Sequence, residues 1–252
     1  MDKLIIEGGN RLVGTVKVSG AKNSALPLMA ATLLTGGEFT LTNVPGLKDI
    51  ETFSTLLSHF GAKVSENIDN TVTIDTTNVN QTDAPYELVK TMRASVLALG
   101  PLLARFKKAR VSMPGGCAIG ARPIDIHLKG LEALGAKVEV EHGYVIVSAE
   151  ELTGADIALD FPTVTGTANL MLAAVFAKGT TTITGAAKEP EIEDLERALT
   201  DMGAKVEGAG TDTIKITGVE ADALRAIEYR VMPDRIEAGT FMVAAAMTTG
   251  NV

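Results

Sequence analysis

The residue best suited to carry chemistry is Cys117, the only cysteine of the chain, which lies in the stretch from Ser112 to Ile124. This stretch holds three glycines and two prolines in thirteen residues, a composition that interrupts helices and strands and predicts a loop. Glycines on both sides of Cys117 let the backbone approach a ligand closely, and the nearby Arg122 favours the thiolate. A lone cysteine is more often an inert apolar side chain, but this setting favours a nucleophile or a proton donor.

A second candidate is Lys22, which lies in the segment from Ser19 to Pro27. Because proline is tolerated in the first helical turn, Pro27 predicts a helix that starts near Ser24, with Lys22 and Asn23 just before it. A lysine there opposes the helix dipole unless an anion is bound between them. The alternative, a solvated lysine in a turn, is the commoner case for an isolated lysine.

Arg93 lies at the equivalent start of a second alanine-rich segment. It either binds an anion or pairs with a nearby carboxylate. If Lys22, Arg93 and Arg122 meet, this acidic protein focuses a positive field on one cleft. Such a cleft suits an anionic substrate such as a phosphate or a carboxylate.

Other polar residues fit structural roles better. The basic run from Arg105 to Arg110 falls at a predicted helix C-terminus, where the dipole stabilises cations, so we interpret it as a solvated corner. His59 and His142 lack the spacing of metal ligands, and His127 is either a site residue or a structural one. Neither G-x-G-x-x-G nor G-x-x-x-x-G-K-[ST] occurs, so no dinucleotide fold or P-loop is indicated.

The elements that must position these residues recur with a period of about 70 residues. A Gly-Ala-Lys-Val signature at Gly61, Gly135 and Gly203 follows an amphipathic segment each time and precedes a predicted hairpin. Each glycine is expected to end a helix at positive φ. An alanine-rich helix and a strand lie upstream, so each unit is predicted as β-α-β-α-β-β. We therefore expect a mixed α/β (α+β) domain of pseudo-threefold symmetry, in which three small sheets enclose a helical core.

The repeats also predict the bounds of the elements. The alanine-rich helices are expected at 24–34, 91–105 and 166–177, and the amphipathic helices at 50–60, 128–134 and 192–202. The strands are expected at 39–43, 62–65, 71–75, 110–113, 136–140, 144–148, 180–184, 204–207 and 213–217. Gly100-Pro101 should kink or break the second alanine-rich helix.

A fourth copy of the unit begins at residues 234–247, and the chain ends at Val252, where the next strand should start. This helix ends apolar and uncapped, so we expect a truncated second domain. The alternative is a terminal capping helix of the kind that repeat proteins use.

Composition narrows the class of protein. The chain has 252 residues, of which 46% are hydrophobic and 4% aromatic, so its core is built from aliphatic side chains. The net charge of -8 argues against non-specific nucleic-acid binding. One cysteine cannot form an internal disulfide, and no signal peptide or membrane-spanning run is present, which favours the cytoplasm.

Five segments in order across the chain resemble the UDP-N-acetylglucosamine enolpyruvyl transferase (MurA) family. They are Ser19 to Asn23, Lys90 to Ser95, Pro114 to Asp125, Ala187 to Ile192 and Pro233 to Glu237. The cysteine loop distinguishes this family from its sibling, the enolpyruvylshikimate-phosphate synthases. The resemblance implies an α-β prism, or inside-out barrel, of three repeated units in each of two domains. Residues 21–229 would form one complete prism, and residues 1–20 and 230–252 would belong to the second, whose remainder is absent.

The resemblance also implies a reaction. An enolpyruvyl group passes from phosphoenolpyruvate to the 3-hydroxyl of UDP-N-acetylglucosamine, with release of phosphate, in the first committed step of peptidoglycan synthesis. Cys117 matches the cysteine that forms a phospholactoyl adduct and serves as proton donor or in product release, and that fosfomycin alkylates. Lys22 and Arg122 would clamp phosphoenolpyruvate. No cofactor or metal is implied.

The resemblance further implies which residues hold the sugar nucleotide. They are Asn23, Arg93, the stretch of Arg122, Pro123, Ile124, Asp125 and Ile126, and, in a second nucleotide-binding loop, Thr163 and Val164. The segment 161–166 departs from the pattern of some members, which weakens the assignment of Thr163 and Val164. The general base is expected in the missing half, so we expect this chain alone to be inactive. Other classes of function stay open: a non-catalytic module that binds anionic nucleotides, the sibling synthase, or a purely structural repeat protein.

Overall fold

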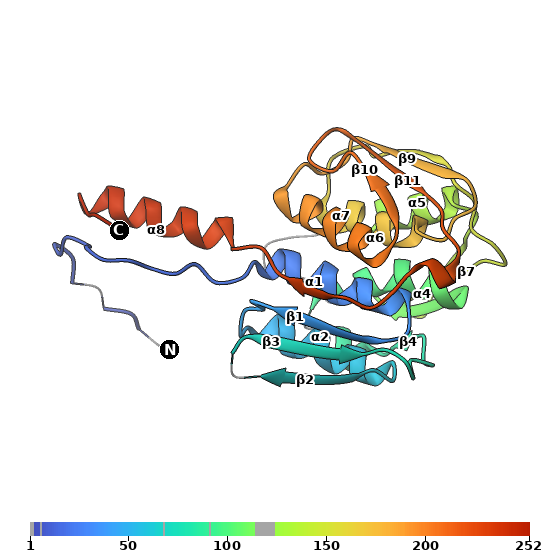
Figure 1. Cartoon of the computed structure of the whole chain (residues 1–252), viewed down its shortest axis with the longest axis horizontal. Helices are drawn as coiled ribbons and strands as arrows, with labels where there is room; N and C mark the ends of the chain where they lie inside the picture. Colours follow the sequence, from blue (N-terminus) through green and yellow to red (C-terminus); the bar gives the residue numbers. More distant parts are fainter. Residues whose placement is uncertain (1–2, 6, 68, 91, 114–123) are drawn as a thin grey trace.

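The computed structural model describes residues 3–5, 7–67, 69–90, 92–113 and 124–252. In these residues, three four-stranded sheets surround a set of packed helices (Figure 1). The first sheet has the order β12-β1-β3-β2, with β1 (Glu38–Thr42), β2 (Lys63–Asn67), β3 (Thr71–Asp75) and β12 (Glu228–Arg230). The second has the order β4-β5-β7-β6, with β4 (Asp83–Ala84), β5 (Lys108–Ser112), β6 (Lys137–Glu141) and β7 (Tyr144–Ser148). The third has the order β8-β9-β11-β10, with β8 (Asp156–Ala158), β9 (Thr180–Thr184), β10 (Lys205–Glu207) and β11 (Thr213–Thr217).

The three sheets share one pairing pattern. Each has a parallel pair at one edge (β1 with β12, β4 with β5, β8 with β9) and antiparallel pairs elsewhere. This agreement confirms the predicted pseudo-threefold arrangement of mixed α/β units. The sequence did not predict β12, which pairs Thr40 with Glu228 and so completes the first unit with residues from the far end of the domain.

The helices fall into two groups. The alanine-rich helices α1 (Lys22–Ala31), α4 (Leu99–Phe106) and α6 (Val164–Ala174) are buried on nearly all sides and form the centre of the core. The amphipathic helices α2 (Lys48–His59), α5 (Asp125–Ala133) and α7 (Pro190–Met202) bury only one face. Short segments complete this part of the fold: α3 (Tyr86–Val89) and the 3₁₀ turns η1 (Thr32–Leu34), η2 (Arg93–Ala98) and η3 (Ala221–Ala223).

The signature glycines end their helices as predicted. Gly61, Gly135 and Gly203 follow α2, α5 and α7 with φ values of +105°, +93° and +114°. A Cβ at Gly203 would also lie 2.4 Å from the backbone oxygen of Ala223. Residues with a side chain would be strained here, which explains why the three units share this signature.

The start of the first helix was predicted wrongly. The amides of Ser24 and Ala25 both bond to the oxygen of Ala21, so α1 begins at Lys22 and Pro27 lies inside it. Lys22 is therefore the first helical residue, not a residue ahead of the helix. Burial of the helix from Ser24 to Ala31 outweighs the local cost of an internal proline.

The predicted break at Gly100-Pro101 is present. The segment consists of the 3₁₀ turns of η2 followed by α4, with Pro101 in the first turn of α4, where its missing N–H costs little. The helix α4 ends at Lys107, which has a left-handed φ of +62°.

One helix projects from the rest. The helix α8 (Arg235–Met247) is capped by Asp234, whose carboxylate accepts from the amides of Ile236 and Glu237 at 2.8 and 3.2 Å. Figure 1 shows α8 and the N-terminal stretch extending together away from the sheets. Bonds such as Asn251 N to Leu12 O (2.8 Å) join them. Large apolar side chains of α8, including Met242 and Met247, are exposed. No helix in the described ranges is long and apolar enough to cross a membrane.

Candidate functional site

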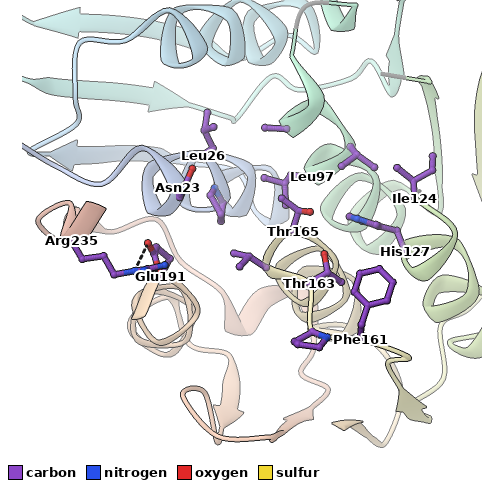
Figure 2. Close-up of a pocket in the computed structure, with 15 residues that line it drawn as sticks. Asn23, Leu26, Leu97, Ile124, His127, Phe161, Thr163, Thr165, Glu191 and Arg235 are labelled. Atoms are coloured by element: carbon purple, nitrogen blue, oxygen red, sulfur yellow. Dashed lines mark hydrogen bonds and ion pairs between the residues drawn. The ribbon is translucent and has the colours of Figure 1, made fainter. Parts of the chain in front are cut away.

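A cavity of about 570 Å³ opens where elements of all three units meet (Figure 2). Its wall is built from the start of α1, the 3₁₀ turns of η2, the start of α5, the segment before α6, and single residues of α7 and α8. Among the residues that line it are Asn23, Leu97, Ile124, His127, Thr163 and Glu191. The cavity is large enough for a ligand of nucleotide size.

The segment before α6 forms one side of the cavity. Thr163 is the N-cap of α6, and its hydroxyl oxygen accepts from the amide of Gly166 at 3.3 Å. Phe161, which also lines the cavity, is 50% exposed. Val164, the first residue of α6, completes this wall. The N-terminus of an 11-residue helix thus borders the cavity, and its dipole favours negative charge there.

The start of α1 presents Asn23 to the cavity, but not Lys22. The ammonium of Lys22 instead lies 2.8 Å from the carboxylate of Asp49 in α2, and both side chains are 38% exposed. A carboxylate at this distance offsets the unfavourable position of a lysine in the first turn of a helix. Lys22 is therefore an ion-paired residue beside the cavity rather than a solvated lysine.

The other predicted site residues divide between described and undescribed parts of the chain. Ile124 lines the cavity, whereas Asp125 and Ile126, the first residues of α5, do not. Cys117, Arg122 and Pro123 lie outside the described residues, as does the side chain of Arg93. The structure therefore brings together Asn23, Ile124, Thr163 and Val164. The expected convergence of cations with the thiol remains a prediction.

Glu191 and Arg235 are cavity residues to which sequence reasoning gave no role. Glu191 is 2% exposed, and its carboxylate accepts from Nε of Arg235 at 3.0 Å (Figure 2). Arg235 comes from α8, so one wall of the cavity depends on a residue that lies outside the three units. Glu191 and Arg235 both belong to segments that resemble the family, and this was the sequence feature that could have identified them as site residues.

His127 is a buried member of the cavity wall. It is 3% exposed, and its Nδ1 lies 3.1 Å from Nδ2 of Asn169 in α6. The side-chain oxygen of Asn169 in turn accepts from the amide of Gly100 at 2.8 Å. A chain of buried polar contacts thus runs from the cavity wall into the helical core.

Asp194 joins the start of α1 to the segment that precedes α8. Its carboxylate, 2% exposed, accepts from the hydroxyls of Ser24 and Tyr229 and from the amide of Met232. Burial and the hydrogen bond to Asp194 raise the pKa of Tyr229 to about 12, so the phenol stays a donor. The network holds the residue next to Asn23 in place. The described residues contain no cluster of histidine, cysteine, aspartate or glutamate side chains that could hold a metal ion.

Three repeated units with sheets outside and helices inside, and a cavity at one end of the helices, define an α/β prism of the enolpyruvyl transferase class. A family model described as EPSP synthase (3-phosphoshikimate 1-carboxyvinyltransferase) matches residues 6–252. The chain belongs to this family.

Solved structures agree with this assignment. The enolpyruvyl transferase NikO from Streptomyces tendae matches with a TM-score of 0.82 and 27% identity, over 95% of this chain and 56% of that one. The EPSP synthase from Acinetobacter baumannii matches with a TM-score of 0.76 over 96% of this chain and 55% of that one. At 23% identity, the second likeness speaks for the fold alone.

Curated relatives are more similar. UDP-N-acetylglucosamine 1-carboxyvinyltransferase of Desulfatibacillum aliphaticivorans is 62% identical, and that of Geotalea uraniireducens (strain Rf4) is 60% identical, each over all 252 residues. The chain spans 60% of the length of these relatives. The predicted fold class and the resemblance to UDP-N-acetylglucosamine enolpyruvyl transferases are thereby confirmed.

Proposed function

We propose that this chain is part of an enzyme that transfers the enolpyruvyl group of phosphoenolpyruvate to the 3-hydroxyl of UDP-N-acetylglucosamine. The 3-hydroxyl gives up its proton and its oxygen forms a bond to C2 of phosphoenolpyruvate, the bond from C2 to the phosphate oxygen breaks, and phosphate leaves with a proton in the net reaction. The observation that carries the proposal is the 62% identity, over the whole chain, to a transferase named for this reaction. The same similarity disfavours the sibling synthase, whose solved relative is 23% identical.

The cavity supports a nucleotide-binding role. Asn23, Ile124, Thr163 and Val164 lie on its wall, and the N-terminus of α6 borders it. In this proposal they hold the sugar nucleotide together with the other predicted residues, which are Arg93, Arg122, Pro123, Asp125 and Ile126. Asp125 and Ile126 do not line the cavity and are the weaker members of this set. Thr163 keeps a second lone pair for a ligand, because its hydroxyl oxygen accepts one amide bond.

The reacting groups are Cys117, Lys22 and Arg122. Cys117 would act as nucleophile or proton donor, and the two cations would bind the phosphate and carboxylate of phosphoenolpyruvate. Lys22 must exchange Asp49 for the substrate, since its ammonium now lies 2.8 Å from that carboxylate. An exposed ion pair of this kind is weak enough for a dianionic ligand to displace.

The domain assignment is part of the proposal. Residues 21–229 form the prism, and residues 1–20 and 230–252 begin a second domain, except that Arg230 pairs with Thr42 in the first sheet and so belongs with the prism. The exposed apolar side chains of α8 and of the N-terminal stretch, such as Leu4 and Met247, support a further packing partner. That partner would be the remaining part of the protein, consistent with relatives of which this chain spans 60%. With a sugar nucleotide as its substrate, the proposed location of the enzyme is the cytoplasm.

The test uses Cys117, the only thiol of the chain. Alkylation by a maleimide should slow at least fivefold when UDP-N-acetylglucosamine and phosphoenolpyruvate are present, because a ligand beside the thiol shields it. UDP alone and inorganic phosphate report which subsite gives the protection. An alkylation rate that none of these ligands changes would contradict the proposal. Such a rate is the result expected for a structural repeat protein.

A second assay separates an enzyme from a binding module. The 252-residue chain should release negligible phosphate from the two substrates, whereas the whole protein should release it steadily. Cys117→Ser in the whole protein should lower turnover at least a hundredfold. Protection of the thiol without turnover by the whole protein would favour the non-catalytic nucleotide-binding module.

A further inference from the structure

We propose that Asn169 is a positioning residue that holds His127 in the tautomer whose ring proton is on Nε2. Asn169 lies in α6 behind the cavity wall and is fully buried. His127 lines the cavity near Thr163 and Thr165 (Figure 2). Asn169 does not line it and contacts the His127 ring at Nδ1.

The orientation of the Asn169 amide follows from Gly100. The backbone N–H of Gly100 can only donate, and it lies 2.8 Å from the side-chain position Oδ1 of Asn169. That atom must therefore be the carbonyl oxygen, which leaves the NH₂ group facing His127. Close packing enforces the contact, because a Cβ at Gly100 would lie 2.6 Å from the same oxygen.

The amide orientation in turn determines the tautomer. The NH₂ group of Asn169 only donates, and it lies 3.1 Å from Nδ1 of His127. Nδ1 must accept, so the neutral ring carries its proton on Nε2. A proton on Nδ1 would bring the N–H of His127 and the NH₂ of Asn169 face to face as two donors. His127 is 3% exposed, so water cannot separate them.

The consequence concerns ligand recognition, and it rests on the proposed function of the cavity. In this tautomer Nε2 carries a proton and no lone pair, whether its acceptor is a protein group or a ligand. A cavity wall of this kind suits the carbonyl, phosphate and hydroxyl oxygens of a sugar nucleotide. Asn169 would thus influence binding without touching the ligand.

The direct test is the ring-nitrogen NMR spectrum of His127, with Asn169→Asp as the variant. The carboxylate keeps an acceptor for the Gly100 amide and places a second acceptor opposite Nδ1. We expect Nδ1 to be unprotonated in the wild type and protonated in Asn169→Asp. His142, exposed in a hairpin turn, serves as the internal reference.

Thr167→Val is the matched control. Thr167 is also a buried residue of α6, and its hydroxyl oxygen accepts from the amide of Ala187 at 3.1 Å. The variant removes a buried hydrogen bond without touching His127 and should leave the ring nitrogens unchanged. Calorimetry with UDP-N-acetylglucosamine should show binding about tenfold weaker for Asn169→Asp than for Thr167→Val.

The outcomes separate the two proposals. An unprotonated Nδ1 in Asn169→Asp, or an equal change in Thr167→Val, overturns the tautomer assignment. Equal nucleotide affinity of the two variants overturns the role in recognition. If the wild type binds no sugar nucleotide, the proposed function fails, while the nitrogen spectra still decide the tautomer.

Discussion

Nε of Arg235 lies 3.0 Å from Oε1 of Glu191, so the first residue of α8 is bonded to a carboxylate buried in α7. The contact connects the helix that projects from the prism with the wall of the cavity. A second hydrogen bond at the same junction runs from the amide of Asp234 to the backbone oxygen of Ser19, at 2.8 Å, and so includes the N-terminal stretch. The junction is therefore built from specific polar contacts, and each can be tested.

Arg235→Ala should lower the free energy of unfolding by about 1–2 kcal/mol, because it removes the cation beside a buried carboxylate. The partial exposure of the Arg235 side chain keeps the loss below that of a fully buried pair. Urea denaturation measures the change. Lys48→Ala, which breaks an exposed pair with Glu51, should change stability much less, because solvent screens that pair. Equal losses for the two variants would show that burial of Glu191 does not matter.

Asp194→Ala should be more damaging, with a loss of about 3 kcal/mol, because it leaves the Ser24 hydroxyl and the Met232 amide without their acceptor and removes an ion-pair partner of Arg197. The Tyr229 hydroxyl keeps the backbone oxygen of residue 194 as an acceptor, at 3.1 Å. Asp201→Ala, at an exposed position of the same helix, is the control and should change stability little. Thermal and urea unfolding give both values. A loss below about 1 kcal/mol for Asp194→Ala would mean that water replaces the network.

Stability should fall at high pH through Tyr229. Its pKa is raised to about 12 by burial and by the bond to Asp194, so the neutral phenol stabilises the folded state below pH 10. That contribution, about 1 kcal/mol after allowance for partial exposure, is lost as the pH rises from 10 towards 12. Tyr229→Phe should therefore flatten the decline between these values, whereas Tyr86→Phe, at an exposed ring, should not. Parallel declines in both variants would exclude this residue as the cause.

Gly100→Ala should destabilise the core by about 2–3 kcal/mol. A Cβ there would lie 2.3 Å from the backbone oxygen of Asn169 and 3.2 Å from the nitrogen of Ala173, atoms that cannot move independently of α6. Gly239→Ala offers a matched helical control, since no atom lies within 4 Å of its added Cβ. The control should gain up to about 1 kcal/mol from helix propensity. Unfolding curves of the two variants should thus shift in opposite directions.

The sequence alone determined the repeated architecture, because the period-two and helical patterns and the helix-ending glycines are local properties. It placed the strands near Thr71 and Thr180 and the break before Pro101 close to their observed positions. The family resemblance also identified Asn23, Ile124 and Thr163, and all three line the same cavity in the structure.

Only the tertiary structure decided how distant segments meet. The strand β12 joins the first sheet, Lys22 forms an ion pair with Asp49, and Arg235 forms one with Glu191. None of these contacts follows a local pattern, because each depends on packing between residues far apart in the sequence. The tautomer of His127 is of the same kind, since it depends on Gly100 and Asn169 meeting in the core. Local sequence patterns determined the helices and strands of this protein, whereas packing in the shared core determined which polar groups pair with one another.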